Sequence, residues 1–433
     1  MKIIPLLDNR LFLARQKIPA RWLHPRYVSL LALAVLLLFW SFVPFRENGG
    51  FADYPAFYRP AADNLLAGKG YVQGDERLAT RYPPGFPLLL ALLEKIALAL
   101  NLPRAALLAL LYAGCFCASA RLIYALAVTW WKPASAFLVS VAWMTYLPLL
   151  WLTTQPFTET PYLLLFLSGL WLFWRGIAQA SPNYLCSYLF GCGLLLGGAA
   201  LIRPMGSFIG FALIFCLFAL RSRFKLTWKN AWLSVVLLMA GQLTIWLPWQ
   251  GYAYAHSGRV FFLSTAFVPA MRDGLRFAVN QKGYRQPLAL PDDVLKLMER
   301  INTRSEEMET SRQVIKIVTE EGRSTPFAAV KLYAIKMARA WYATDSASRE
   351  TPLLLLQIFY LSLIATAIWR GYRAGILDSR WGWIIALVLL GSWGTTTLVL
   401  SILRYMTPAI SLLFLFLPGL WHGATQAEPA TNE

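Results

Sequence analysis

Histidine and acidic residues are scarce in this 433-residue sequence, and its cysteines show no ligand pattern. The three histidines, His24, His256 and His422, are scattered along the chain. The cysteines fall in apolar segments without zinc or CxxC spacing, and are expected to be small buried hydrophobic residues. They are Cys115, Cys117, Cys186, Cys192 and Cys216. The pattern therefore indicates no histidine- or cysteine-based metal centre. A divalent metal held by Asp and Glu alone is left open, although nothing in the sequence indicates one.

Charged residues make up only 14% of the chain, whereas 58% of the residues are hydrophobic and 18 are tryptophan. These values lie far from the soluble average and are typical of a protein that crosses a membrane many times. The net charge of +18 would also suit a nucleic-acid partner. The basic residues, however, collect in short loops between apolar runs, where membrane topology explains them better. We therefore expect contact with membrane lipids and no nucleic-acid partner.

Apolar runs that approach the roughly 20 residues needed for one crossing recur along most of the chain. They lie at 28–45, 85–100, 105–128, 134–151, 160–176, 184–201, 205–220, 231–249, 352–369, 382–400 and 405–421. Lys and Arg collect before the first run, at 221–229 and at 370–380, so these segments are expected inside. The segments 46–83, 152–159 and 250–351 and the turn at Arg404 then face outside.

The charge pattern places both the N-terminus and the C-terminus on the inner side. Eleven crossings conflict with this, because an odd number of crossings puts the two ends on opposite sides of the membrane. The weakest run is 85–100, which is short and opens with PPGFP, so we expect a juxtamembrane helix there. The fold class is therefore an all-α polytopic bundle of about 10–12 spans.

Five regions follow along the chain. Residues 1–27 form a cytoplasmic N-terminal segment, and 28–249 an N-terminal transmembrane module that includes the outer loop 46–83. Residues 250–351 form a large outer loop, 352–421 the C-terminal transmembrane helices and 422–433 a polar tail. The large loop is too long for a connector, and its apolar residues have helical spacing. After Pro326 the pattern predicts an interfacial helix with a Lys/Arg face.

The first outer loop contains the stretch GGFADYPAFYRPAADNLLAGKGY, Gly49 to Tyr71. Pro55 suits a first helical turn, and the spacing predicts an amphipathic helix from Tyr54 to Ala67 with Tyr58 on its apolar face and Arg59 four residues before Asp63. Gly68 is a typical C-terminal stop, followed by Lys69. Asp53 heads this helix, either as an N-cap or as a functional carboxylate.

This stretch and five later segments occur in an order that resembles one family. The later segments are RYPPGFPLLLAL (Arg81 to Leu92), TQPFTETPYLLLFL (Thr154 to Leu167), GGAALIRPMG (Gly197 to Gly206), WLPWQGYAYAHSGRVFFLST (Trp246 to Thr265) and LRYMTPAI (Leu403 to Ile410). It is similar to the GT-C glycosyltransferases that use polyprenyl-phosphate sugars, in particular bacterial protein mannosyltransferases and aminoarabinose transferases. The resemblance covers nearly the whole chain. It implies a GT-C bundle with juxtamembrane helices in the first outer loop, located in a bacterial inner membrane with its active site on the periplasmic side.

The resemblance also implies roles for individual residues. The family's catalytic acid falls on Asp53, although many relatives have Asp-Glu where this chain has Asp53-Tyr54. The donor phosphate is expected at a group of basic and hydroxyl residues: Arg81, Tyr82, Arg404, Tyr405, Lys69 and Arg203. Three further residues are expected to lie near the acceptor or to contact the residues that bind it: Glu159, Tyr58 and Arg59. Each of these residues also has a structural interpretation, such as a helix end or an interfacial anchor.

The implied reaction is the inverting transfer of a sugar from a polyprenyl-phosphate donor to a lipid, glycan or protein hydroxyl, with no required cofactor. Lipid A is one such acceptor. Two other functions are consistent with a polytopic chain: a transporter or flippase, and a polysaccharide polymerase or ligase outside the GT-C class. A transporter should place ionisable residues within its spans, whereas here they cluster at the outer rim, with Arg121 the main exception.

Overall fold

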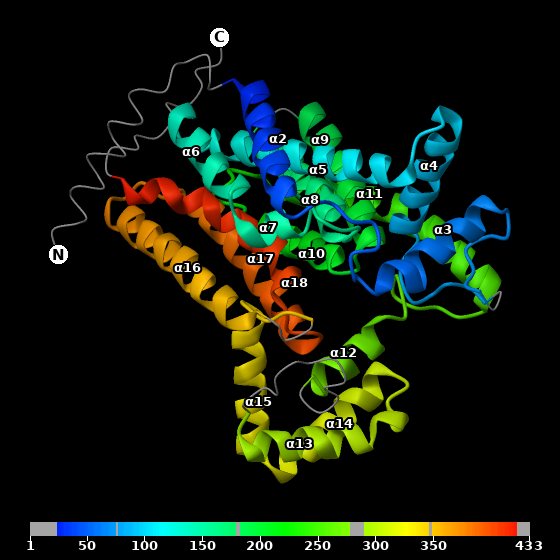
Figure 1. Ribbon diagram of the computed structural model, residues 1–433. Coiled ribbons are helices and arrows are strands. Elements are labelled where there is room, and N and C mark those ends of the chain that lie inside the picture. Colours follow the sequence, from blue (N-terminus) through cyan, green and yellow to red (C-terminus); the bar gives the residue numbers. More distant parts are fainter. Residues whose placement is uncertain (1–23, 75–76, 179–181, 278–289, 346–348, 422–433) are drawn as a thin grey trace.

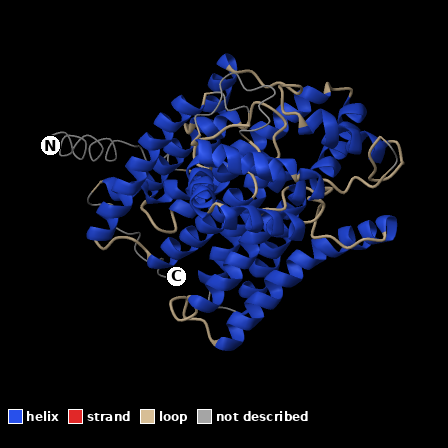
Figure 2. Cartoon of the chain, turned by 90° about the horizontal axis from the view of Figure 1, so that it is seen from below, coloured by secondary structure: helices blue, strands red, loops and turns tan. Residues whose placement is uncertain are grey.

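The computed structural model of the chain is built from helices (Figure 1). It describes residues 24–74, 77–178, 182–277, 290–345 and 349–421. Within these ranges it contains no strand (Figure 2), and an isolated antiparallel bridge joins Val72 and Leu78. The residues 1–23 and 422–433, which include most of the predicted N-terminal segment and the polar tail, lie outside the described part of the chain.

The helices follow the apolar runs of the sequence. In chain order they are α2 (Pro25–Phe42), η2 (Tyr54–Tyr58), α3 (Arg59–Leu66), α4 (Gly85–Leu100), α5 (Arg104–Ala127), α6 (Pro133–Met144), α7 (Leu147–Trp151), α8 (Glu159–Ala178), α9 (Pro182–Ile202), α10 (Gly206–Ala219), α11 (Trp228–Ser257), α12 (Phe267–Leu275), α13 (Asp292–Thr303), η3 (Ser305–Glu307), α14 (Ser311–Ser324), α15 (Pro326–Arg339), α16 (Glu350–Arg373), α17 (Ser379–Leu398), α18 (Leu403–Leu413) and η4 (Phe414–Leu420).

Eight helical segments in the described residues are long and apolar enough to cross a membrane, and α6 and α10 are shorter apolar helices. The all-α polytopic fold is thus confirmed, and the chain is a multi-pass membrane protein. Two predicted spans are not continuous helices. The run 134–151 divides into α6 and α7 before Pro148, and the run 405–421 becomes the 3-10 segment η4 around Pro418, since proline lacks the N–H that an α-helix needs.

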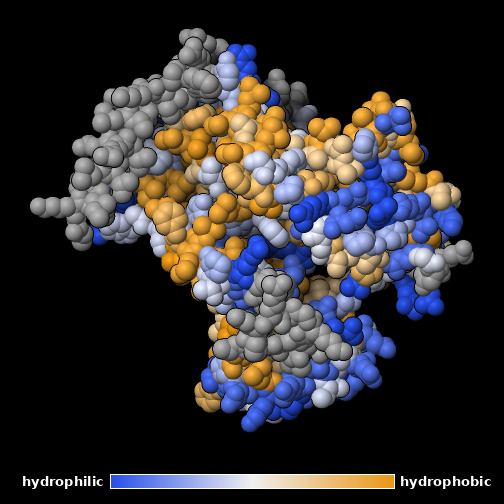
Figure 3. Space-filling model, in the orientation of Figure 1, coloured by the Kyte–Doolittle hydropathy of each residue, from blue (hydrophilic) through white to orange (hydrophobic). Residues whose placement is uncertain are grey.

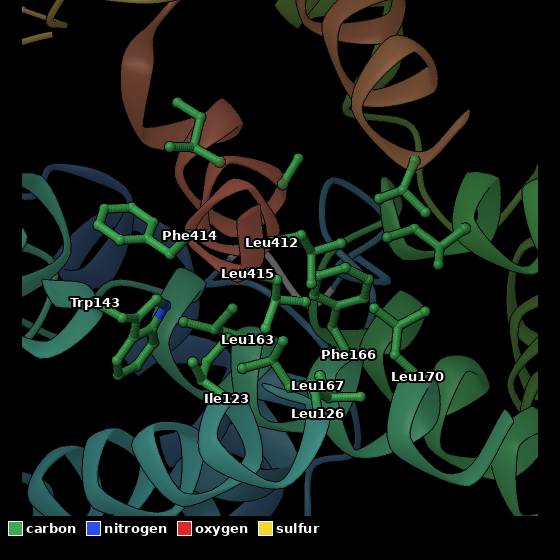
Figure 4. Packing of buried hydrophobic residues seen from close by; sticks show 14 of the residues in the cluster. Ile123, Leu126, Trp143, Leu163, Phe166, Leu167, Leu170, Leu412, Phe414 and Leu415 are labelled. Atoms are coloured by element: carbon green, nitrogen blue, oxygen red, sulfur yellow. The ribbon is translucent and has the colours of Figure 1, made fainter. Parts of the chain in front are cut away.

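The bundle core is a continuous apolar cluster that joins the N-terminal and C-terminal spans. Ile123 and Leu126 of α5 belong to the same cluster as Phe166 of α8, Leu412 of α18 and Phe414 of η4 (Figure 4). All five side chains are buried. Helices from both halves of the sequence therefore share one packed interior.

Small residues allow a close contact between helices α9 and α11. A Cβ atom on Gly193 would lie 2.2 Å from the Leu238 carbonyl oxygen, and one on Gly241 would lie 2.3 Å from the Phe190 carbonyl oxygen. Neither position has room for a side chain, so the two backbones pack directly against each other. This use of small residues is common between transmembrane helices.

Helices α12–α15 form a lobe, residues 267–339, that projects from one end of the bundle (Figure 1). The lobe has its own apolar core, which includes Leu275, Leu297, Ile317 and Leu332. Its surface is largely hydrophilic, whereas the bundle is largely hydrophobic (Figure 3). The helical content predicted for the 250–351 loop is therefore confirmed.

The helix predicted after Pro326 is present as α15, but its basic residues do not share one solvent-exposed face: Lys331 is 52% exposed, whereas the other two are buried. Lys336 and Arg339 point into the structure and are buried, while Phe327 and Val330 are exposed. The sequence pattern correctly predicted an amphipathic helix. The rest of the lobe and the α17–α18 junction, however, cover Lys336 and Arg339, and neighbouring groups accept hydrogen bonds from both side chains.

The segments predicted to face outside meet at the end of the bundle that carries the lobe. Arg46 N–H donates to the Thr154 carbonyl (2.8 Å), and Thr265 N–H donates to the Thr80 carbonyl (2.8 Å). Arg404 at the start of α18 pairs with Asp345 in the link that follows α15. The loops that hold the candidate site residues are therefore in direct contact.

Candidate active site

Asp53 heads a π-turn rather than a regular α-helix. The predicted helix from Tyr54 to Ala67 is divided into η2 and α3, and the Arg59 N–H donates to the Tyr54 carbonyl across five residues. Pro60 has no N–H to donate to Ala56, so the regular α-helical bond is missing at this point. Turns of this kind are frequent at functional sites.

The interpretation of Asp53 as an N-cap is wrong. Its side chain makes no capping hydrogen bond, and its backbone is already helical. The carboxylate is partly exposed. It has no hydrogen bond or ion pair within the described ranges. The carboxylate therefore does not stabilise the turn through such a contact.

The residue after Asp53 is firmly anchored. Tyr54 is buried, and its hydroxyl donates to Glu47 Oε1 at 2.8 Å. The same carboxylate oxygen lies 2.6 Å from Arg104 Nη2 at the start of α5. Tyr54 thereby ties the head of the π-turn to a membrane-spanning helix.

Glu159 lies at the centre of a buried ion network. It begins α8, is only 1% exposed, and its Oε1 atom is 2.5 Å from Arg203 Nη1 and 3.6 Å from Arg404 Nε. Arg203 also donates to Thr158 Oγ1 at 2.8 Å. Arg203 follows the last residue of α9 and precedes Pro204, so the end of the helix directs its side chain to this point. One carboxylate therefore holds two guanidinium groups from distant parts of the chain.

Arg404 has a second acidic partner and a surrounding of rings. Its Nη2 atom lies 3.3 Å from Asp345 Oδ1. Its guanidinium carbon lies 5.0 Å from the ring centre of Phe51 and 5.3 Å from that of Tyr405. Arg203 lies 4.6 Å from the same Tyr405 ring. Tyr405 therefore sits between the two cations, with its ring face available for cation–π attraction.

Two tyrosines connect this network with Asp53. The rings of Tyr58 and Tyr82 lie 4.8 Å apart between centroids. Burial raises the pKa of both phenols, and the Asp53 carboxylate raises each further. Both hydroxyls are therefore protonated donors at neutral pH. Asp53 also lies within electrostatic range of Arg404.

The remaining predicted residues lie farther from this centre. Lys69 is exposed on the turn after α3. Arg59 pairs along its own helix with Asp63 at 3.8 Å. Arg81 lies 4.2 Å from the centre of the Phe57 ring, and its Nε atom is buried without a hydrogen-bond acceptor. Among the predicted cations, the structure thus brings Arg203 and Arg404 together, with Arg81 beside Tyr82 on the neighbouring loop.

Sequence reasoning missed Asp345, Thr158 and the two phenylalanines Phe51 and Phe157, whose rings lie 4.8 Å apart below Arg404. Phe51 and Phe157 lie within the segments Gly49–Tyr71 and Thr154–Leu167, and this position was the sequence signal that could have identified them. Asp345 carried no such signal. Within the described residues no group of three or more His, Cys, Asp or Glu side chains could hold a metal ion.

Glu159→Gln is expected to destabilise the protein by about 3–5 kcal/mol, because it leaves two buried guanidinium groups without their shared counter-charge. The measurement is thermal unfolding of the detergent-solubilised protein. Glu320→Gln is the matched control, since Glu320 is 44% exposed and pairs at the surface with Arg304. Equal melting temperatures for the two variants would show that Glu159 does not hold the network together.

Comparison with known proteins adds information on the fold. No protein-family model and no curated protein matches the sequence. Among solved structures, the archaeal oligosaccharyltransferase AglB from Archaeoglobus fulgidus, in complex with an inhibitory peptide and a dolichol-phosphate, matches with a TM-score of 0.51 and 14% identity. The match covers 91% of this chain and 50% of AglB, so this chain spans about half the length of that protein.

A second solved structure, ArnT from Cupriavidus metallidurans bound to undecaprenyl phosphate, matches with a TM-score of 0.44 and 13% identity. It covers 90% of this chain and 76% of the ArnT chain, but the superposition is too loose to support an argument. The likeness to AglB shows a shared fold and confirms the predicted GT-C-type bundle.

Proposed function

We propose that this protein is an inverting glycosyltransferase that moves a sugar from a polyprenyl-phosphate carrier to a hydroxyl group of a lipid, glycan or protein acceptor. The observation that carries the proposal is the buried pair Arg203 and Arg404 with an unpaired carboxylate, Asp53, within electrostatic range of Arg404. The fold shared with an oligosaccharyltransferase whose structure contains dolichol-phosphate supports the same conclusion.

The cations suit the leaving group of this reaction. When the bond between the sugar and the phosphate breaks, negative charge grows on the phosphate oxygens. Guanidinium groups bind phosphate through two parallel N–H bonds, and Arg404 has a buried Nε atom without a hydrogen-bond acceptor. The Tyr58 and Tyr82 hydroxyls can donate to the same oxygens. Because these donors are in place before the reaction, they favour the transition state over the ground state.

Asp53 suits the acceptor side. The acceptor hydroxyl loses its proton to the Asp53 carboxylate, its oxygen forms a bond to the anomeric carbon, and the electrons of the broken C–O bond pass to the phosphate. The phosphate leaves as a stable anion and needs no general acid. One carboxylate is therefore enough, whereas a glycosidase needs two.

The location of the charges favours this function over transport. Arg203, Arg404, Glu159 and Asp345 lie where loops meet at one end of the bundle. A transporter site is expected near the middle of the membrane, between broken helices. We further propose that the end carrying the lobe faces the periplasm of a bacterial inner membrane, because Lys and Arg are concentrated in the loops 221–229 and 370–380, which belong on the cytoplasmic side.

The donor side can be tested by binding. Undecaprenyl phosphate should bind the detergent-solubilised protein in native mass spectrometry, and undecaprenol should not, because the cations recognise the phosphate. Arg203→Gln should weaken that binding by about 10-fold or more, the loss expected for one charge-assisted hydrogen bond. Equal retention of the phosphate and the alcohol would contradict the proposed site.

A further inference from the structure

Lys336 is a fully buried lysine at the joint between the lobe and the bundle. It lies on α15 and has no exposed surface. Its ammonium group donates to two backbone carbonyls, that of Gly274 on α12 at 2.9 Å and that of Val399 after α17 at 3.3 Å. One side chain thus connects two helices of the lobe to the end of a membrane-spanning helix.

The carbonyl of Val399 belongs to the segment that leads directly into Arg404. Val399 directly follows the last residue of α17, and residues 400–402 connect it to α18. Gly274 is pressed against this segment, since a Cβ atom there would overlap the Val399 carbonyl oxygen. On the other side, Leu403 N–H donates to the Ala343 carbonyl at 2.9 Å. The backbone before Arg404 is therefore held on one side by α12 and Lys336 of α15, and on the other by the link that follows α15.

A buried salt bridge holds the same link. Arg339 makes two bonds to Glu350, at 2.8 and 2.9 Å, and Glu350 also accepts a bond from Thr344 N–H at 3.1 Å. This fixes the turn that presents Asp345 to Arg404. Asp345 and Arg339 line a cavity of about 180 Å³ together with residues 400–402. The contacts of the lobe thus converge on both neighbours of Arg404, the segment before it and its acidic partner.

No carboxylate compensates the Lys336 charge in the described part of the chain. The charged groups on the surrounding elements have other partners. On α12, Asp273 pairs with Arg276, and Arg272 donates to the Ser305 carbonyl. On α13 and α15 the pairs are Arg339 with Glu350, Asp293 with Lys331, and Arg300 with Glu321. The centre of the Tyr333 ring lies 5.9 Å from the ammonium nitrogen. Burial accordingly lowers the pKa of Lys336 to about 7. An uncompensated buried lysine reduces stability, so packing alone does not account for it.

We propose that Lys336 is a positioning residue for Arg404: it fixes the α17–α18 junction against the lobe and so holds the guanidinium at the donor phosphate. This inference rests on the proposed function for its catalytic consequence. Its structural part, the placement of residues 399–404, stands independently. The bonds to the two carbonyls are strongest when the amine is protonated, so the contribution of Lys336 should be largest below about pH 7 and decline above it.

The test uses Lys336→Met in the full-length protein, with Lys331→Met as the matched control, because Lys331 lies on the same helix but is 52% exposed. Hydrogen exchange of the amides at 399–404 should become faster in Lys336→Met and remain unchanged in the control. The maximal rate should fall by about 10- to 100-fold, because a misplacement of about 1 Å can cost about 10²-fold in rate. The KM for the acceptor should change little.

Two further readouts separate positioning from support of the fold. Lys336→Met should melt at or above the wild-type temperature, since apolar replacement of a buried charge is often stabilising. The folded protein releases the Lys336 proton near pH 7 and the unfolded chain near the ordinary value of about 10.4, so the stability deficit of wild type against Lys336→Met should shrink as pH rises between these values. Lys336→Gln, which keeps one donor, should be intermediate in exchange and rate.

Unchanged exchange at 399–404 in both Lys336→Met and Lys336→Gln would overturn the inference. Exchange is measured without substrate, so it decides the positioning role even if the wild-type protein shows no transferase turnover. Absent turnover with faster exchange would count against the proposed function alone.

Discussion

Asp53→Asn is expected to lower turnover by about 10²–10⁴-fold, the usual cost of losing a general base, while the melting temperature stays close to that of wild type. Asparagine has the size of aspartate but cannot accept the acceptor proton at neutral pH. The stability should be retained because the Asp53 side chain makes no capping bond and the π-turn is anchored instead through Tyr54 and Glu47. Donor binding should also survive.

Asp63→Asn is the matched control, because Asp63 lies on the helix that follows the π-turn, is 54% exposed and pairs only weakly with Arg59. Its turnover should equal that of wild type. If Asp53→Asn retained full turnover, Asp53 would not be the base, and another carboxylate would have to accept the proton.

Arg404→Ala is expected to lower turnover by about 10²–10³-fold, the loss typical for removal of one preorganised donor to developing charge. Affinity for undecaprenyl phosphate should fall as well, because the phosphate loses a bidentate partner. The site should not collapse, since Glu159 keeps its bond to Arg203 and Asp345 is 54% exposed to solvent. Turnover with a lipid-linked donor and native mass spectrometry with undecaprenyl phosphate measure the two effects.

Arg404→Lys tests geometry against charge at the same position. Lysine restores the charge but not the two-pronged donor, so it should recover only part of the rate. Arg304→Ala is the control for a salt-bridged arginine outside the site, since Arg304 pairs with Glu307 and Glu320 on the lobe surface. Full activity in Arg404→Ala would contradict a role for this residue at the phosphate.

Hydropathy predicted the architecture well because the bilayer imposes a length and an apolar composition on each crossing. It could not predict the breaks before Pro148 and around Pro418, because neighbouring helices decide whether a proline in a span ends a helix. The π-turn after Asp53 was also missed. Its apolar spacing over so few residues is the same as that of an α-helix.

The candidate site was predicted in part. The motif order led to Asp53, Arg203, Arg404 and Tyr405, which the structure gathers at one end of the bundle. Asp345 could not be found, because its pairing with Arg404 depends on how the lobe folds back on the bundle. The burial of Lys336 was missed for the same reason: an amphipathic pattern identifies two faces of a helix but does not say which one is covered.

The most direct test of the account is the release of undecaprenyl phosphate from an undecaprenyl-phosphate-linked sugar, measured with purified wild type and Asp53→Asn at equal donor occupancy in the presence of a mixed lipid and glycan acceptor fraction. The account predicts release by wild type, in step with sugar transfer, and a loss of about 10²–10⁴-fold in Asp53→Asn. Transfer at the same rate by both proteins would contradict it, as would binding of the donor by wild type without any release.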